Sequence, residues 1–101
     1  MPISNIIKRG NWYDIYDEKG DKIKTISTNI GLILGFSSVF IVVERGNWYY
    51  LYNDEGKKYK AISINIGIVI SVTGNTFVVR RGNWLVTYDD LGKKIRTIPA
   101  R

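Results

Sequence analysis

Three arginines stand at equal intervals along the chain, each directly ahead of a Gly-Asn-Trp tripeptide. The arginines and the tryptophans that follow them are Arg9, Arg45, Arg81, Trp12, Trp48 and Trp84. A guanidinium group binds phosphate and carboxylate groups through paired hydrogen bonds. An indole ring offers a flat surface on which a sugar or a nucleobase stacks. If the three copies are arranged symmetrically, the arginines form a cationic rim suited to an anionic ligand.

Three tyrosines recur at the matching positions Tyr16, Tyr52 and Tyr88, and they complete the candidate ligand-binding set. A structural interpretation competes with the binding one. Each tryptophan follows a tight turn and opens an apolar run, so the sequence favours packing of the Trp and Tyr rings between sheets. The arginines are then solvated turn residues, and Lys22, Lys58 and Lys94 lie on a solvated strand.

Nothing in the chain resembles catalytic machinery. There is no His and no Cys, which removes the commonest general base, the commonest metal ligand, disulfides and thiolate metal sites. Asp14 breaks the repeat, because the other copies have Tyr50 and Val86 at its position, but a lone carboxylate is no mechanism. We therefore predict no catalytic residue and no cofactor, and the protein is not expected to be an enzyme.

The acidic turns do not predict a metal site either. Carboxylates gather in the segments 17–21, 54–55 and 89–90, which are spaced like the arginines. A calcium site needs six or more oxygen ligands, and each turn offers only two or three carboxylates beside lysine. These segments are interpreted as solvated turns.

An internal repeat of 36 residues organises the whole sequence. The tryptophans are separated by 36 residues in both intervals, without insertions, and glycines recur in step at Gly20, Gly56 and Gly92. We expect one all-β domain over residues 1–101, made of three repeats at about 1–36, 37–72 and 73–101.

Each repeat divides into short extended runs separated by turn residues. In the second copy the runs are 40–45, 48–52, 57–63 and 66–72, rich in β-branched and aromatic residues. Gly46-Asn47 predicts a two-residue hairpin of type II′, and the turn that ends at Gly56 predicts a G1 bulge. The chain is predicted to be a meander of four-stranded units with about eleven strands in all.

The apolar pattern predicts sheets that are covered on both faces. Apolar side chains fall on both sides of most runs, and only the lysine-rich run 57–62 and its counterpart 93–98 are half polar. A propeller blade is packed on both sides by its neighbours, and its outermost strand faces water. The pattern therefore favours propeller-type blades with the lysine-rich strand outermost.

The segment from Gly67 to Trp84, continued by 88–95, resembles a short β-propeller blade. Its Trp, apolar run and Asp-x-x-Gly-Lys sequence are similar to the third and fourth strands of WD-type and bacterial WG-type repeats. The repeat is shorter than that of WD40 proteins, and the Gly-His and Trp-Asp signatures are missing. The resemblance implies the fold and no particular function.

Three blades are too few to close a propeller, which takes 4–8. Two large apolar blade faces left in water promote association. We therefore expect a homodimer of three-bladed chains that closes a six-bladed ring. The alternative is a monomer closed on its own threefold axis, a β-trefoil or a bulb-lectin β-prism. The mannose-binding box of those lectins fails here, because Arg80, Gly82 and Trp84 replace its polar ligands.

The expected function is a non-catalytic binding or protein-interaction module. The alternative is a carbohydrate- or anion-binding module, lectin-like or nucleic-acid-binding, that uses the symmetric Arg, Trp and Tyr positions. The formal net charge of +6 favours anionic partners. No apolar run reaches the length of a signal peptide or of a membrane span, so we expect a cytoplasmic protein without a membrane partner, a mature secreted form being the alternative.

Overall fold

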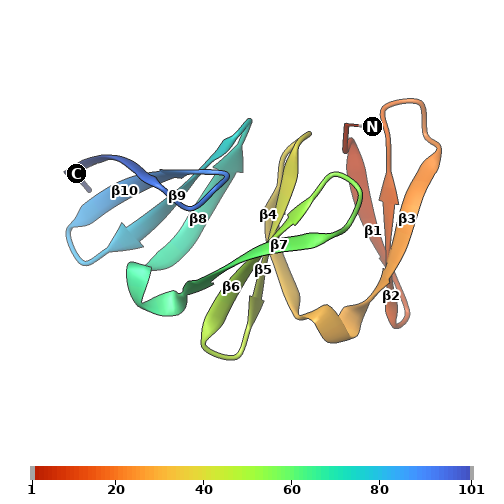
Figure 1. Cartoon of the computed structure of the whole chain (residues 1–101), viewed down its shortest axis with the longest axis horizontal. Coiled ribbons are helices and arrows are strands. Elements are labelled where there is room, and N and C mark those ends of the chain that lie inside the picture. The colour runs from red at the N-terminus through yellow and green to blue at the C-terminus, as the bar shows by residue number, and fades with distance from the viewer. Residues whose placement is uncertain (1, 101) are drawn as a thin grey trace.

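The computed structural model describes residues 2–100 as eleven β-strands and two single-turn 3₁₀ helices (Figure 1). The strand number agrees with the prediction. The strands are β1 (Asn5–Arg9), β2 (Trp12–Tyr16), β3 (Lys22–Ser27), β4 (Leu32–Phe36), β5 (Phe40–Arg45), β6 (Trp48–Asn53), β7 (Lys58–Ser63), β8 (Ile68–Thr73), β9 (Thr76–Arg81), β10 (Trp84–Asp89) and β11 (Lys94–Pro99). The 3₁₀ turns are η1 (Thr28–Ile30) and η2 (Ile64–Ile66).

The strands form three separate antiparallel sheets that stand side by side along the long axis of the molecule (Figure 1). The first sheet has the order β1-β2-β3, the middle sheet β4-β5-β6-β7, and the third sheet β8-β9-β10-β11. The molecule measures 40 × 27 × 23 Å as a result. The prediction of an all-β meander is confirmed.

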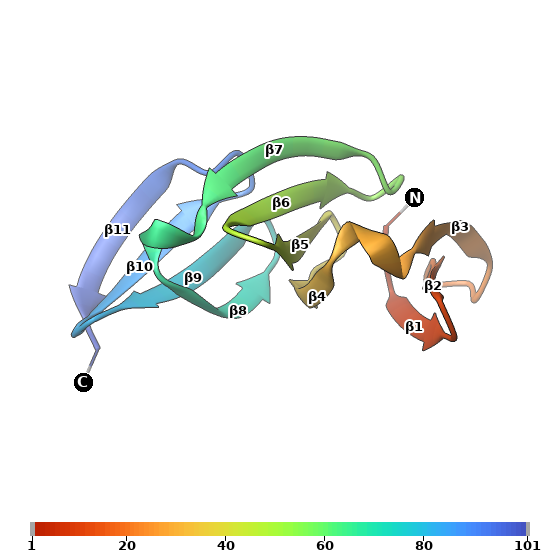
Figure 2. The ribbon, with the colours of Figure 1, turned by 90° about the horizontal axis from the view of Figure 1, so that it is seen from below.

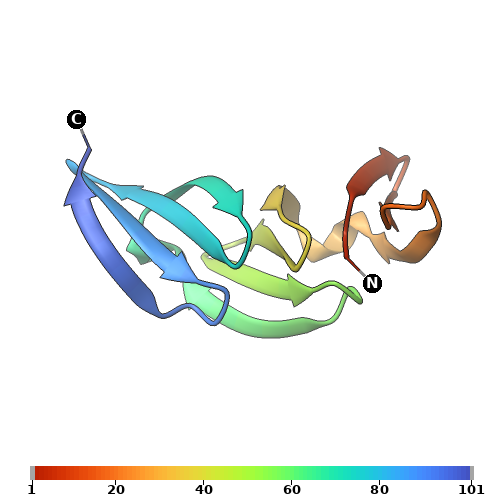
Figure 3. The ribbon, with the colours of Figure 1, turned by 90° about the horizontal axis from the view of Figure 1, so that it is seen from above.

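The lysine-rich strands lie at the outer edge of each sheet, as predicted. β7 and β11 are edge strands, and most of their residues are exposed. In Figure 2 they run along one side of the molecule, while β4 and β8 lie on the opposite side; Figure 3 shows the same arrangement from above. We call β4 and β8 the inner strands, and they contact each other between the middle and third sheets.

The turns between strands have the predicted geometry. Gly46 has a φ of 62°, whereas Asn47 has none of the positive φ values, which are confined to glycines in the described chain. A positive φ at the first loop residue alone is the pattern of a type II′ turn. Gly56 has a φ of 79° and donates its N–H to the Asn53 carbonyl, as the predicted bulged turn requires. Local turn chemistry therefore sets the hairpins.

The inner strands pair forward, which places them differently from the sequence expectation. The run 66–72 was expected to follow the lysine-rich run in one unit, but β8 begins at Ile68 and pairs with β9 of the next sheet. Ser63 caps η2, and Gly67 then turns the chain with a φ of 131°. Ile68 is consequently exposed rather than buried.

The middle sheet is covered on both of its faces. Phe40, Val42 and Leu51 are buried against the third sheet, where they meet Phe77 and its neighbours. The opposite face packs on the first sheet, where the buried residues are Ile3, Ile15, Ile41, Val43 and Tyr52. The middle sheet thus packs on the first sheet with one face and on the third sheet with the other. We call this arrangement, in which each interface joins two different kinds of face, head-to-tail stacking.

The outward faces of the two end sheets are more polar than the buried faces, contrary to expectation. On the first sheet Asp14 stands where the middle sheet has Tyr50, and Asn5 stands where it has Ile41. The outward face of the third sheet has Thr76, Val78, Arg80, Leu85 and Thr87 where the middle sheet has Phe40, Val42, Glu44, Tyr49 and Leu51. Within residues 2–100, only the middle sheet has another sheet packed on each of its two faces.

Tyrosine hydroxyls tie each sheet to the next one. Tyr13 in the first sheet donates to the Gly31 carbonyl at the start of the middle sheet, over 3.1 Å. Tyr49 makes the equivalent bond to the Gly67 carbonyl, over 2.6 Å. The third copy has Leu85 at this position, which has no hydroxyl group. In the described chain, the tie thus joins the first sheet to the middle sheet and the middle sheet to the third.

Candidate ligand-binding site

Each sheet presents the same frame of charged and aromatic side chains at one hairpin. The Gly-Asn turn pairs each arginine directly with the tryptophan that follows it, as in Arg81 with Trp84. Paired residues share a face of the sheet, and so does the residue two positions after the tryptophan. That residue is Asp14, Tyr50 or Val86, and it decides what the frame encloses.

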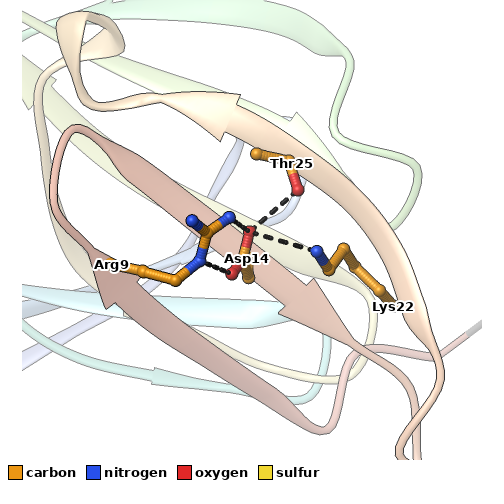
Figure 4. Close-up of polar contacts among 4 residues, drawn as sticks. All are labelled: Arg9, Asp14, Lys22 and Thr25. Atoms are coloured by element: carbon orange, nitrogen blue, oxygen red, sulfur yellow. Dashed lines mark hydrogen bonds and ion pairs between the residues drawn. The ribbon is translucent and has the colours of Figure 1, made fainter.

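In the first sheet, Asp14 collects the surrounding polar groups (Figure 4). Its Oδ2 accepts a hydrogen bond from Arg9 Nε over 2.9 Å, and its Oδ1 accepts one from the Thr25 hydroxyl over 2.8 Å. Lys22 Nζ lies 3.8 Å from the same Oδ1. Asp14 is 2% exposed although it lies on an outward face, because these side chains cover it. The carboxylate of this frame therefore has its partners within the frame, and both cations lie beside it.

The hydrogen bond from Arg9, followed by that from Thr25, lowers the pKa of Asp14 below its usual value. The same bond raises the pKa of the Arg9 guanidinium. Asp14 is therefore held ionised, which does not suit a general acid.

In the middle sheet, Tyr50 fills the frame. The ammonium group of Lys58 lies over the Tyr50 ring, 4.6 Å from the ring centroid, which is cation–π geometry. Tyr50 is also partly buried against the first sheet.

In the third sheet, Val86 is too short to fill the frame, and a hollow of about 530 Å³ opens. Two cationic side chains, one indole ring and one hydroxyl group face it. The hollow is lined by Arg81, Gly82, Asn83, Trp84, Val86, Lys94 and Thr97. Among the described residues, neither Arg81 nor Lys94 has a carboxylate partner in an ion pair. The hollow therefore combines uncompensated positive charge with an apolar floor.

The three tryptophans are half exposed, so the expected burial between sheets is wrong. The exposed fractions are 46% for Trp12, 47% for Trp48 and 51% for Trp84. Each ring opens its strand beside the hairpin turn, at the end of the sheet, where the neighbouring sheet does not cover it. Trp84 is thereby free to line the hollow.

Two of the three tyrosines of the candidate set lie inside the molecule. Tyr52 and Tyr88 are buried in the two interfaces, and the Tyr88 ring stacks on Phe77 with 5.4 Å between ring centroids. Burial raises the pKa of Tyr52. Tyr16 is half-buried on the first sheet. The nine candidate residues are thus spread over three sheets, and only Arg81 and Trp84 share the hollow.

The acidic turns use their first side chain as a local cap. Oδ1 of Asp89 accepts the N–H groups of Leu91 and Lys93, both over 2.9 Å. Asp17 and Asn53 make the same pair of bonds in their own turns. The bonds from Lys93 and Leu91 lower the pKa of Asp89. Over residues 2–100, no three acidic side chains are grouped as metal ligands.

Lys94 and Thr97 are site residues that the sequence analysis did not single out as a pair. They come from β11, which is separated from the hairpin by a turn, so no short motif joins them to Trp84. The available signal was the comparison of copies, because the small residue at position 86 is the one difference that empties the frame.

The fold and the site together define an all-β repeat protein with three stacked antiparallel sheets and an open cationic hollow in the third sheet. No protein-family model, curated protein or solved structure matches the chain. Within the described part of the chain, no helix has the length and apolar character needed to cross a membrane.

Proposed function

We propose that this chain is a non-catalytic binding module that holds a small phosphate- or carboxylate-bearing ligand in the hollow of its third sheet. The observation that carries this proposal is the pair of cations, Arg81 and Lys94, without a carboxylate partner beside the exposed ring of Trp84. Charged groups that lack a partner favour an anion, and the indole favours a ring stacked beside it.

The other two frames support this proposal by contrast. They use the same arginine, tryptophan and lysine positions, but in one frame Asp14 pairs with both cations, and in the other Tyr50 occupies the space. The volume of about 530 Å³ lies within the range of small-molecule sites. A sugar phosphate has both the charge and the ring that the hollow requires.

A fluorescence titration tests the proposal. The variant W12F/W48F leaves Trp84 as the only tryptophan, and it is titrated with glucose 6-phosphate, glucose, inorganic phosphate and a single-stranded oligonucleotide at fixed salt. We expect glucose 6-phosphate to bind more tightly than either of its parts. Because a hydrogen bond to a charged group contributes about 1.5–3 kcal/mol, Arg81→Ala should weaken binding by roughly tenfold or more.

Matched variants separate the hollow from general positive charge. Arg45→Ala removes the same charge from the filled frame, so binding should be unchanged. Val86→Tyr copies the middle sheet and should abolish binding, and circular dichroism checks that the chain stays folded, because Val86 also belongs to the buried cluster between the middle and third sheets. Absence of binding by every ligand, or equal weakening by Arg45→Ala and Arg81→Ala, would contradict the proposal.

The proposed architecture is a half-ring of propeller-type blades, which a homodimer closes into six. The head-to-tail stacking supports it, since each chain presents one face of each kind, as a closing ring requires. The contact would join the polar frame of Asp14 to the outward face that carries Arg80 and Thr87. Sedimentation velocity at low micromolar concentration should give a dimer, and a monomer would contradict ring closure.

A second candidate function, a protein-interaction module, is favoured by one specific feature. The inner edge of the first sheet carries no fourth strand among the described residues. An open strand edge is a template for a strand from another protein.

A further inference from the structure

The first sheet has three strands where the other two have four. β1 is the counterpart of β5 and β9, which pair with the inner strands β4 and β8. Within residues 2–100, no strand pairs with the second side of β1. Most of its residues are exposed.

The open side of β1 presents backbone groups that a further strand would use. Arg9 and Trp12 close the two-residue turn, so Arg9 and Ile7 direct their N–H and C=O groups toward β2. Lys8 and Ile6 direct theirs away. The Ile6 N–H is bonded to Oδ1 of the adjacent Asn5 over 2.9 Å, which is a local substitute for a strand. The edge is thus shaped for antiparallel pairing.

The two inner strands show which sequence fits this edge. Each is directly preceded by a glycine and contains three aliphatic residues, then a small residue, then an apolar residue. The segments are Gly31-Leu32-Ile33-Leu34-Gly35-Phe36 and Gly67-Ile68-Val69-Ile70-Ser71-Val72. In the register of β4, Leu32 faces Glu44, whose counterpart in the first sheet is Lys8. The same register on β1 places the first aliphatic residue opposite Lys8.

The leading glycine is required by close approach. A Cβ at Gly67 would lie 2.6 Å from the Arg80 carbonyl oxygen, and the φ of 131° is one that side chains rarely adopt. A Cβ at Gly31 would meet the Glu44 carbonyl in the same way. A strand docked on β1 in this register brings its glycine against the carbonyl of Lys8.

The small residue in the pattern is required by the neighbouring sheet. A Cβ at Gly35 would lie 2.8 Å from Val72, so β8 packs onto a gap in β4. Phe36 is the counterpart of Val72, one repeat earlier, and it is half-buried. A strand on β1 therefore needs a small residue where Phe36 reaches it.

We propose that the open edge of β1 is a docking site for an extended segment of a second polypeptide with this pattern: glycine, three aliphatic residues, a small residue and an apolar residue. The segment runs antiparallel to β1 and completes the first sheet, so main-chain hydrogen bonds hold it and the glycine and small positions select it. This inference rests on the proposed interaction function and is independent of the anion hollow.

A peptide with the sequence of residues 63–74, followed by two lysines for solubility, is the probe. It is added to the full-length chain, and amide hydrogen exchange is followed by NMR. We expect the Lys8 and Ile6 amides to exchange at least tenfold more slowly. A matched peptide with Gly67→Ala should bind roughly tenfold more weakly or worse, because a strained residue costs about 1–3 kcal/mol.

Two chain variants locate the site. Lys8→Pro removes an N–H on the open side without removing a bond to β2, and it should abolish peptide binding, whereas Lys8→Thr should bind like the natural chain. A chain with a copy of residues 27–36 placed before its first residue supplies its own inner strand. In this chain the amides of Lys8 and Ile6 should be protected from hydrogen exchange, and the added peptide should not bind.

Several results would overturn the proposal. They are unchanged binding by Lys8→Pro, equal binding of the Gly67→Ala peptide, and protection confined to other strands. Failure of the peptide to bind, with no protection of Lys8 and Ile6 in the extended chain, would do the same. Concentration-dependent protection without peptide would assign the edge to a second copy instead. Glucose 6-phosphate binding is measured on the same samples. It shows whether the anion hollow works independently of peptide binding at β1.

Discussion

Asp14, Tyr50 and Val86 occupy one position in three copies of the same frame, with different consequences. The carboxylate of Asp14 gathers Arg9, Thr25 and Lys22, while the ring of Tyr50 carries Lys58 on its face. Val86 engages none of the polar groups and leaves a space. A change of one side chain within a repeat therefore converts a closed cluster into an open site.

The ion cluster at Asp14 should make the stability of the fold depend on acid pH. Because its pKa is lowered in the folded chain, the contribution of Asp14 is fully present above about pH 4, the ordinary value. It is lost as the pH falls through the lowered pKa. In urea unfolding, the natural chain should exceed Asp14→Asn in stability at pH 5–7, and the difference should shrink below pH 4.

Glu18→Gln is the control for this measurement, since Glu18 is exposed in a neighbouring acidic turn. Its stability difference from the natural chain should stay small throughout. A constant difference between Asp14→Asn and the natural chain down to pH 2 would show that the carboxylate is not held ionised by Arg9.

Tyr59 should ionise later than the other tyrosines. Burial raises its pKa to about 12, and its hydroxyl donates to the Asp90 carbonyl of the adjacent sheet. Its contribution is present below about pH 10 and is lost as the pH rises through about 12. In an absorbance titration at 295 nm, the last tyrosine to ionise should be missing from Tyr59→Phe. Tyr59→Phe should also lower the free energy of unfolding at pH 7 by about 1 kcal/mol.

At the scale of elements, the strands follow from short-range signals, but their partners do not. The Gly-Asn turns and the bulged turns bracket the runs, so most strand bounds were predictable from residues such as Gly46 and Gly56. The forward pairing of β4 and β8 was not, because it depends on contacts with strands of the next unit. The 3₁₀ turns before them were also not predicted, although Ser27 and Ser63 cap them through local hydrogen bonds.

The candidate site was predictable in part. Arg81 and Trp84 could be selected because they recur in every repeat. That a hollow lies beside them in the third sheet is indicated only by the small side chain at position 86, where the other repeats have Asp14 and Tyr50. Burial of the tryptophans was wrongly predicted, because alternation specifies a face of a strand and not how far the neighbouring sheet extends over it. Lys94 and Thr97 reach the hollow only through the pairing of β10 with β11.

Gly67 should be far less tolerant of a side chain than the hairpin glycine Gly82. Both have positive φ, but a Cβ at Gly82 meets nothing within 4 Å, whereas one at Gly67 meets the Arg80 carbonyl. Gly82→Ala should lower the free energy of unfolding by about 1 kcal/mol, and Gly67→Ala by about 3 kcal/mol or more. Denaturant unfolding compares them, and equal losses would contradict the close approach.

At the scale of the molecule, stability comes from contact between neighbouring sheets. Leu51 is completely buried and joins the middle sheet to the third. Leu51→Ala should lower the free energy of unfolding by about 2–5 kcal/mol in a denaturant titration. Leu91, which is 62% exposed, is the control, and Leu91→Ala should change it by less than about 0.5 kcal/mol. Similar losses for the two variants would contradict the assignment of the core.

The forward pairing of the inner strands has a consequence for how such a chain lengthens. Every joint between sheets is the same crossing, from an outer strand through a 3₁₀ turn to the inner strand of the following sheet. Tandem duplication of any 36 consecutive residues would therefore insert one more sheet and recreate both joints without new sequence. The chain can therefore lengthen by duplication of gene segments that encode a multiple of 36 residues. A duplication of another length would separate an inner strand from the carbonyl group that its glycine approaches.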